Sequence, residues 1–306
     1  MLTTLTEPTR FDERIEALLQ QGPAEHKADR LVEALATFAE AERLAKELGD
    51  QRAADRAFVN WCTSSLKLER ALRGEHLGRL RAILMAGDDA VSSRLAAYNI
   101  ARAYEFRKEF RKGLFYAQTA LHRSLRLDLP GWVASSHNQI GNFLLAQSRF
   151  EDACGEYEEA LALLPAGPSR RKALILTNLG YSRAVLGHSG ALALIYRSLR
   201  MLRRLGARRD TIIPHLDLCY ALLEAGRCRH AVSHGVRALA LAEEAAEHDS
   251  IRHALFLLGE ASQQRGNPEL AREHFRRLQE RYFPESPHLA DLLLSVDVRK
   301  LINLKA

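Results

Sequence analysis

Apolar side chains recur along almost the whole chain at the i, i+3 and i+4 spacing of a single helix face. Alternating Val, Ile and Thr runs bounded by tight-turn dipeptides, which predict strands, are nearly absent. Helix-breaking residues such as Gly49, Gly87 and Gly226 fall between the periodic stretches and separate pieces of about 12–20 residues. This pattern predicts an all-α chain of short antiparallel helix hairpins.

A small residue returns at a nearly constant interval on alternate predicted helices, each time directly after Ile or Leu. These small residues are Ala101, Gly141, Gly180, Cys219 and Gly259, and they are spaced 40, 39, 39 and 40 residues apart. A fixed period in this range is the signature of stacked structural repeats, each of which buries its apolar face against its neighbours. The sequence therefore predicts a repeat protein.

The segment around one of these small residues has a distinctive set of side chains. Ile140-Gly141 is followed by Ala153, Tyr157 and Pro165, a spacing that resembles the tetratricopeptide repeat. Gly141 and Ala153 are expected where the two helices of a unit cross closely, with Tyr157 filling the gap to the next unit. The family's standard unit is about 34 residues, so these longer units resemble bacterial regulator sensor domains and long-repeat peptide-binding members of the family.

The resemblance implies a right-handed all-α solenoid of about seven tetratricopeptide-like hairpins over residues 1–288. The expected units are 10–49, 50–87, 88–128, 129–167, 168–207, 208–247 and 248–287. Residues 289–306 are expected to form a C-terminal capping helix, because the stretch from Leu289 to Leu304 is amphipathic and open solenoids need a polar-faced cap.

Composition narrows the class of protein further. With 47% hydrophobic residues among 306, the chain can bury a core, and disorder is excluded. No apolar run approaches the ~18 residues that span a bilayer, and the first residues do not resemble a secretory signal. The cysteines form no paired motif and are interpreted as reduced apolar residues, which predicts a cytoplasmic location. They are Cys62, Cys154, Cys219 and Cys228.

Sequence motifs for nucleotide binding, nucleophilic catalysis or metal-dependent hydrolysis are absent from the chain. His230 and His234 have the i, i+4 spacing of metal ligands on one helix face, but no third ligand lies at a fixed distance from them. We interpret them as two solvated histidines. The sequence thus predicts no enzymatic activity, no cofactor and no metal.

Amide side chains recur at one phase of the predicted first helices, directly before the apolar residue of each repeat. The positions are Asn60, Asn99, Gln139 and Asn178, followed by Asp217 in the next unit. Since Asn and Gln make up only 16 of 306 residues, chance alone rarely gives this pattern. An amide carries both a donor and an acceptor, so it can hold an extended backbone.

The resemblance implies that this phase points into a concave groove, where long-repeat members of the family use an asparagine ladder to bind peptides. Three positions further along the same helices are Arg102, Asn142, Tyr181 and Tyr220, which are expected to line the groove beside the ladder. The alternative interpretation is a polar stripe on a wetted helix face.

Basic residues gather on one face of a predicted second helix. They are Arg197, Arg200, Arg204 and Arg208, at spacings of three and four. One interpretation is a docking face for an acidic protein or nucleic acid. The other is the preference of cations for a helix C-terminus.

Together these observations predict a non-catalytic scaffold, sensor or adaptor that binds an extended peptide or partner segment in its groove. The alternative is a regulatory subunit of a larger enzyme, secretion or transcription complex that docks through the arginine face, with nucleic acid as a possible partner. The net charge of +6 is a mild excess and gives only weak electrostatic steering.

Overall fold

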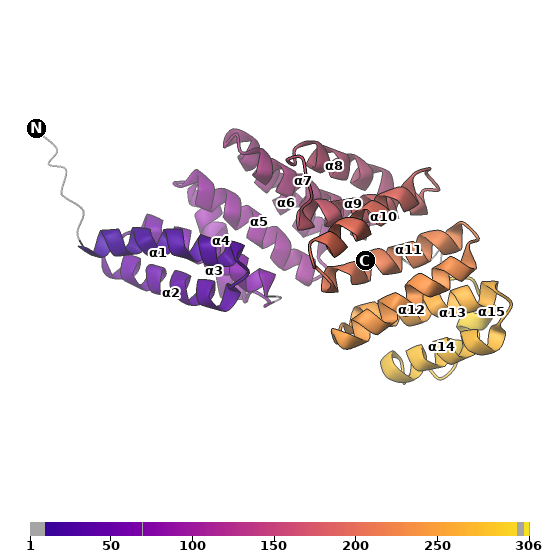
Figure 1. Ribbon diagram of the computed structural model, residues 1–306. Helices are drawn as coiled ribbons and strands as arrows, with labels where there is room; N and C mark the ends of the chain where they lie inside the picture. Colours follow the sequence, from indigo (N-terminus) through magenta and orange to yellow (C-terminus); the bar gives the residue numbers. More distant parts are fainter. Residues whose placement is uncertain (1–9, 69, 299–302, 306) are drawn as a thin grey trace, which may run out of the picture. The chain divides into compact units, whose positions relative to one another are not determined.

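The computed structural model describes residues 10–68, 70–298 and 303–305, and within these ranges the chain forms helices and no strand (Figure 1). The first helices are α1 (Arg10–Lys27), α2 (Leu31–Glu47), α3 (Gln51–Lys67), α4 (Gly74–Ala86), α5 (Ala90–Phe106), α6 (Phe110–Arg126) and α7 (Pro130–Ala146). They are followed by α8 (Phe150–Ala162), α9 (Arg170–Val185), α10 (Ala191–Arg204), the 3-10 turn η1 (Arg209–Thr211), α11 (Ile212–Glu224), α12 (Cys228–Glu244), α13 (His248–Gln264), α14 (Pro268–Tyr282) and α15 (Leu289–Ser295). The predicted all-α fold is confirmed.

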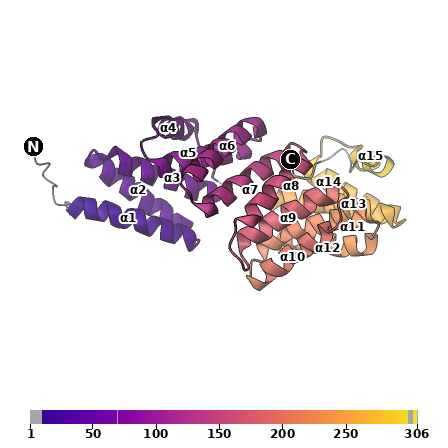
Figure 2. The same cartoon turned by 90° about the horizontal axis from the view of Figure 1, so that it is seen from above.

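Helices α1 to α14 follow one another as seven antiparallel pairs, each joined by a short turn. We call the odd-numbered helix of each pair helix A and the even-numbered one helix B. Helices A of neighbouring pairs contact each other directly, as α3 does with α1 and α5, and as α11 does with α9 and α13. Helices B also contact the helix A that follows them, and Figure 2 shows this layering for α9 to α14. The pairs from α1 to α6 and those from α9 to α14 therefore each stack as the repeats of a solenoid do.

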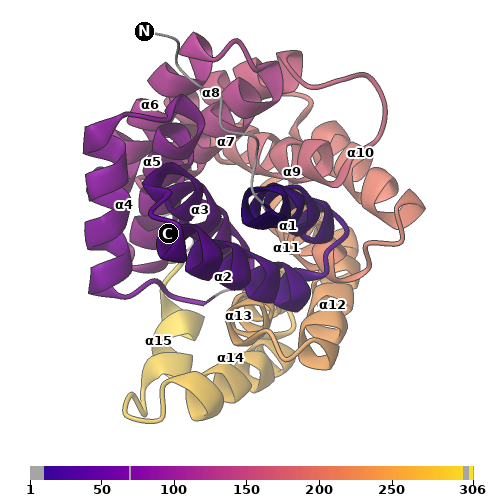
Figure 3. The same ribbon diagram turned by 90° about the vertical axis from the view of Figure 1, so that its left-hand side faces the viewer.

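Contacts divide the chain into two compact units, Met1–Gln139 and Ile140–Ala306. The boundary falls inside α7, so we describe each unit by itself. Unit 1 has a buried cluster of apolar side chains on α3, α4 and α5, with α4 packed against α5 (Figure 3). A single superhelix over residues 1–288 stays a prediction.

The helices of a pair cross closely at the small residues of the repeat. A Cβ placed on Gly141 would lie 2.7 Å from the ring of Tyr157, whose side chain is fully buried. Ala153 on the facing helix is also fully buried. Gly22 meets Phe38 in the same way, which identifies a first repeat glycine that the sequence pattern had not singled out. The predicted close crossing is confirmed, and Tyr157 covers the glycine of its own pair.

The capping helix is shorter than predicted. We expected a helix from Leu289 to Leu304, but α15 ends at Ser295, and Val296 is extended with φ −129° and ψ 127°. Side chains meet the last carbonyls of α15: Gln263 Nε2 of α13 donates to Leu294 O at 2.8 Å, and the hydroxyl of Ser295, the last residue of the helix, donates to Leu292 O at 3.0 Å. Residues 299–302 lie outside the described residues, and residues 303–305 are not helical.

Cysteine side chains are part of the packing rather than of any bridge. Cys62, Cys154 and Cys219 are buried, Cys228 is half-buried, and all four are free. Over the part of the chain that the structure describes, none of the helices combines the length and apolar character that crossing a membrane requires. The cytoplasmic location stays a prediction.

Candidate functional site

Two of the predicted groove amides are buried between helices A of unit 1. Asn99 is fully buried, and its Nδ2 donates to Val59 O at 2.8 Å and to the Thr63 hydroxyl at 3.1 Å. Gln139 is 2% exposed, and its Nε2 donates to Tyr98 O at 3.2 Å. The prediction that these side chains face an open groove is therefore wrong.

Direct packing of successive helices A explains this position. When two helices A touch, the residue before the repeat's apolar position faces the preceding helix instead of solvent. An amide suits that place because its NH₂ group can satisfy a backbone carbonyl of the neighbouring helix. Asn60 is the exception, since it is half-buried and its Nδ2 donates to Arg56 O at 2.8 Å within its own helix.

In unit 2 the corresponding amides are only partly buried. Asn178 Nδ2 on α9 donates to Asn142 Oδ1 on α7 at 3.1 Å. The Tyr157 hydroxyl donates to the same Asn142 oxygen at 2.9 Å, which fixes the orientation of that amide. Both amides are half-buried, so they remain partly accessible from solvent.

Asp217 on α11 is a buried carboxylate, with the residue 3% exposed. It forms an ion pair with Lys305, whose Nζ lies 2.8 Å from Asp217 Oδ2. Burial raises the pKa of the Asp217 carboxyl to about 6, and Lys305 opposes that rise. A buried carboxylate without a cation is costly, so this position favours a positively charged partner.

Two tyrosines lie next to this carboxylate. The rings of Tyr181 on α9 and Tyr220 on α11 are 5.3 Å apart between centroids, and both side chains are buried. Lys305 Nζ sits 5.1 Å from the centroid of the Tyr181 ring, within the range of a cation–π interaction. Burial and the nearby Asp217 charge raise the pKa of Tyr181, whereas a hydrogen bond from the Leu304 backbone opposes the rise.

A short non-helical segment, residues 303–305, connects three helices A of unit 2. Asn303 Nδ2 donates to Leu145 O at the end of α7 at 2.7 Å and to the Ser148 hydroxyl at 3.1 Å. Leu304 contacts Tyr181 of α9 through its backbone, and Lys305 reaches Asp217 of α11. This segment was not predicted, because residues 289–306 were expected to form a helix.

The structure thus brings one set of the predicted site residues together in unit 2. The set comprises Asn142, Asn178, Tyr181, Asp217 and Tyr220. Arg102 belongs to unit 1, where its guanidinium pairs with Glu105 at 2.5 Å and lies 5.5 Å from the Phe106 ring. We therefore place the candidate site on the helices A of unit 2 and call it the unit 2 surface.

The predicted arginine face is exposed, but one of its four residues lies outside the helix. Arg197, Arg200 and Arg204 lie on α10 and are exposed, and no carboxylate in the described residues lies within ion-pair distance of them. Arg208 lies after α10 has ended and pairs with Glu244 at 2.5 Å. The chain leaves the helix after Arg204 because Gly206 takes the left-handed φ of 66°. The assignment of Arg208 to this helix face is therefore wrong.

One of the two histidines interpreted as solvated is instead part of a buried cluster. His234 on α12 is half-buried, and its Nδ1 lies 2.8 Å from Nδ1 of the buried His215 on α11. The Tyr196 hydroxyl lies 3.3 Å from His234 Nε2. His230 is exposed, as expected. Among the described residues, no three metal-ligating side chains come close enough to hold an ion.

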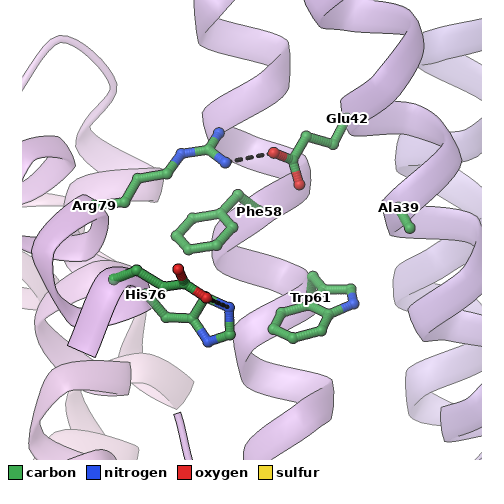
Figure 4. Close-up of a pocket in the computed structure, with 7 residues that line it drawn as sticks. Ala39, Glu42, Phe58, Trp61, His76 and Arg79 are labelled. Atoms are coloured by element: carbon green, nitrogen blue, oxygen red, sulfur yellow. Dashed lines mark hydrogen bonds and ion pairs between the residues drawn. The ribbon is translucent and has the colours of Figure 1, made fainter. Parts of the chain in front are cut away.

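Unit 1 has a separate open pocket of about 420 Å³, which the sequence did not indicate. Figure 4 shows Phe58 and Trp61 projecting into it from α3, with His76 of α4 facing Trp61 at 5.2 Å between ring centroids. Arg79 stacks on Phe58 and pairs with Glu42. The carboxylate of Glu42 thus holds Arg79 in place at this pocket.

No family profile matches the sequence, and no curated protein matches it. Solved structures do resemble it in fold. A Rap protein complexed with Competence and Sporulation Factor aligns with a TM-score of 0.73 at 14% identity, over 94% of this chain and 79% of that one. The apo form of the quorum sensor NprR from B. thuringiensis aligns with a TM-score of 0.62 at 12% identity, over 92% and 81%.

A signal transduction ATPase with a tetratricopeptide repeat sensor, from Pyrococcus horikoshii, aligns with a TM-score of 0.63 at 12% identity. The alignment covers 99% of this chain and 52% of that protein, so this chain spans about half its length. At these identities the likeness concerns the fold. Together with the seven helix pairs and their close crossings, it shows that this chain is an all-α helical repeat protein of the tetratricopeptide-like fold.

Proposed function

We propose that this chain is a non-catalytic scaffold, of the sensor or adaptor type, whose unit 2 surface binds an extended segment of a partner protein or peptide. One observation carries the proposal: a non-helical piece of the chain itself, residues 303–305, is held by three helices A of unit 2. Polar side chains and a carboxylate hold it, as they would hold a foreign segment.

Two similarly folded proteins support this proposal. One was solved in complex with Competence and Sporulation Factor, and another is a quorum sensor. The chemistry of the surface supports it as well. Asn142 and Asn178 offer amide donors and acceptors for a backbone, and the Tyr181 ring lies beside the cation of Lys305.

The test begins with selection of peptides from a random library against the full chain. The affinity of a selected peptide is then measured by calorimetry for the parent, for Asn178→Arg and for Arg200→Glu. The long cation of Asn178→Arg blocks the half-buried centre of the surface, so we expect at least a tenfold loss of affinity, or about 1.4 kcal/mol. Arg200→Glu lies on α10 and should bind like the parent. The reverse order of effects would contradict the proposal.

The alternative function is docking through the arginine face. It is favoured by one observation, which is that Arg197, Arg200 and Arg204 are exposed on α10 without a carboxylate beside them in the described part of the chain. In this case the protein would be a regulatory subunit, and the partner would be an acidic protein or nucleic acid. Such binding is strongly salt-dependent, which separates it from the main proposal.

A further inference from the structure

Residues 303–305 occupy a position on the unit 2 surface that is complementary to a basic, extended segment. We infer that they are an intramolecular occupant of this surface, and that a partner displaces them by placing a basic side chain of its own on Asp217. The inference rests on the proposed function and names the chemistry of the partner. Two observations carry it: the charge that Asp217 needs, and the contacts of the segment.

The carboxylate of Asp217 selects for a cation. Asp217 is 3% exposed, and Lys305 is separated from it by 88 positions along the chain, so the ion pair is a tertiary contact. Removing the cation while the carboxylate stays buried is strongly unfavourable. A displacing segment therefore has to supply a positive charge at the same place, and the Tyr181 ring beside it adds a second favourable contact for a cation.

The contacts of residues 303–305 are of the kind that many peptides can make. Asn303 and the Leu304 backbone contribute hydrogen bonds to Leu145, Ser148 and Tyr181. Within the segment, the Lys305 N–H donates to Asn303 Oδ1 at 2.9 Å, which shapes it as a turn. Each of the three residues is only half-buried. The segment is therefore held by a few contacts instead of being built into the core.

The covalent tether determines how strongly the segment competes. Because residues 303–305 belong to the same chain as Asp217, their binding is intramolecular and has the advantage of an effective concentration over a free peptide. A few hydrogen bonds and one ion pair are enough to keep it bound under these conditions. A free partner then binds with an apparent affinity lowered by the fraction of molecules in which the surface is vacant. The segment would thus raise the concentration of partner that is needed for binding.

The direct test uses the full chain and a fluorescein-labelled peptide with the sequence of residues 301–306, Leu-Ile-Asn-Leu-Lys-Ala. Its affinity is measured for the parent, for the double variant Asn303→Ala with Lys305→Met, and for the control Lys172→Met, a surface lysine of the same unit. We expect the double variant to bind the peptide at least tenfold more tightly than the parent or the control. A peptide whose lysine is replaced by methionine should lose this binding.

A second measurement follows the segment in place by hydrogen exchange. Asp217→Asn keeps the shape of the side chain and removes the charge, so the amides of residues 303–305 should exchange faster than in the parent. Glu244→Gln, which removes an exposed carboxylate paired with Arg208 in the same unit, should leave them unchanged. Unchanged exchange in Asp217→Asn would overturn the inference, as would equal affinity of the labelled peptide for the parent and the double variant.

The outcomes separate this inference from the proposed function. A library-selected peptide that loses affinity in Asn178→Arg, but binds the parent and the Asn303→Ala/Lys305→Met variant equally, would show that the surface binds partners. It would also show that residues 303–305 do not compete with them. If the labelled peptide behaves as expected but selected peptides bind Asn178→Arg as well as the parent, the segment occupies the surface as inferred, but partners bind elsewhere and the proposed function fails.

Discussion

Asn99 and Gln139 stabilise the stacking of neighbouring helices A. Each donates a hydrogen bond to a backbone carbonyl of the helix A of the preceding pair. Asp217 occupies the same phase of a later repeat, but it receives a cation from residue 305. One position of the repeat therefore holds a packing amide in α5 and α7 and an ion-paired carboxylate in α11. The difference lies in the side chain and in what covers it.

Asn99→Ala should destabilise the protein by about 0.5–1.5 kcal/mol, because it removes the hydrogen bonds of a fully buried amide to α3, although Val59 O keeps the Thr63 hydroxyl as a donor. Asn60→Ala is the matched control, since this half-buried amide bonds only within its own helix, and it should have little effect. Urea unfolding monitored by circular dichroism measures both. Equal stability of Asn99→Ala and the parent would restore the interpretation of a solvated stripe.

His215 makes the stability of the protein depend on pH. Burial, followed by His234 and the charges of Arg203 and Arg237, lowers the pKa of His215 from 6.5 to about 3. The unfolded chain therefore binds a proton that the folded chain rejects. The stabilisation is complete above pH 6.5 and is lost progressively as the pH falls toward about 3. Tyr196 completes this cluster through its hydrogen bond to His234.

We expect the free energy of unfolding of the parent to fall more steeply between pH 7 and pH 5 than that of His215→Gln, which cannot take up a proton. The exposed His188→Gln serves as the control and should follow the parent. Urea unfolding at several pH values measures the slopes. Identical slopes for the parent and His215→Gln would show that this histidine does not contribute to the pH dependence.

The sequence identified several residues of the site without giving their surroundings. Tyr181, Tyr220 and Asp217 follow from the repeat phase, and they do lie together. The burial of Asn99 could not be foreseen, because a repeat period fixes the phase of a residue but not how closely two helices A approach. Asn303 and Lys305 carry no periodic signal at all, since only the folded chain brings them to α7 and α11.

At the scale of the helix pair, stability depends on close crossings. A Cβ on Gly141 would approach the buried Tyr157 ring to 2.7 Å, so Gly141→Ala should cost about 1–3 kcal/mol. Gly155 lies in the facing helix with nothing within 4 Å of an added Cβ. Gly155→Ala should therefore be neutral or stabilise by up to about 1 kcal/mol.

Thermal melts of the two alanine variants and the parent check this pair of predictions. Because both changes add one methyl group to a helix of the same pair, their difference isolates the effect of the crossing. If Gly141→Ala melts at the parent temperature, the helices can separate without loss, and the packing described for this repeat is wrong.

The helix pairs themselves were well predicted, because a period of 39–40 residues and the breakers between helices are local features. The end of the last helix, α15, was not predicted correctly. The stretch after Ser295 keeps an amphipathic pattern, but α15 ends at Ser295, where Gln263 from α13 donates to Leu294 O. A tertiary contact of this kind leaves no trace in a periodic pattern.

At the scale of the whole molecule, the fold supplies repeated surfaces and the chemistry of individual residues assigns their use. The arginine face on α10 and the unit 2 surface are two such candidates. A triple charge reversal, Arg197→Glu with Arg200→Glu and Arg204→Glu, should leave the affinity for a selected peptide unchanged. Any association of the parent with duplex DNA at low salt should vanish in this variant.

Exposed charges are screened over ~8–10 Å at physiological salt, so the parent should bind duplex DNA weakly or not at all there. Fluorescence anisotropy with labelled DNA at several salt concentrations gives the comparison. Nanomolar DNA binding at physiological salt that disappears in the triple variant would instead favour the alternative function.

We propose that a partner segment lies on the helices A of unit 2, and photo-cross-linking can locate it. A selected peptide carries a photoreactive group next to its basic residue, and mass spectrometry identifies the attached residue of the full chain. We expect attachment close to Tyr181, Asp217 and Tyr220, suppressed in Asn178→Arg. Attachment to α10 around Arg200, or attachment that Asn178→Arg leaves unchanged, would contradict it.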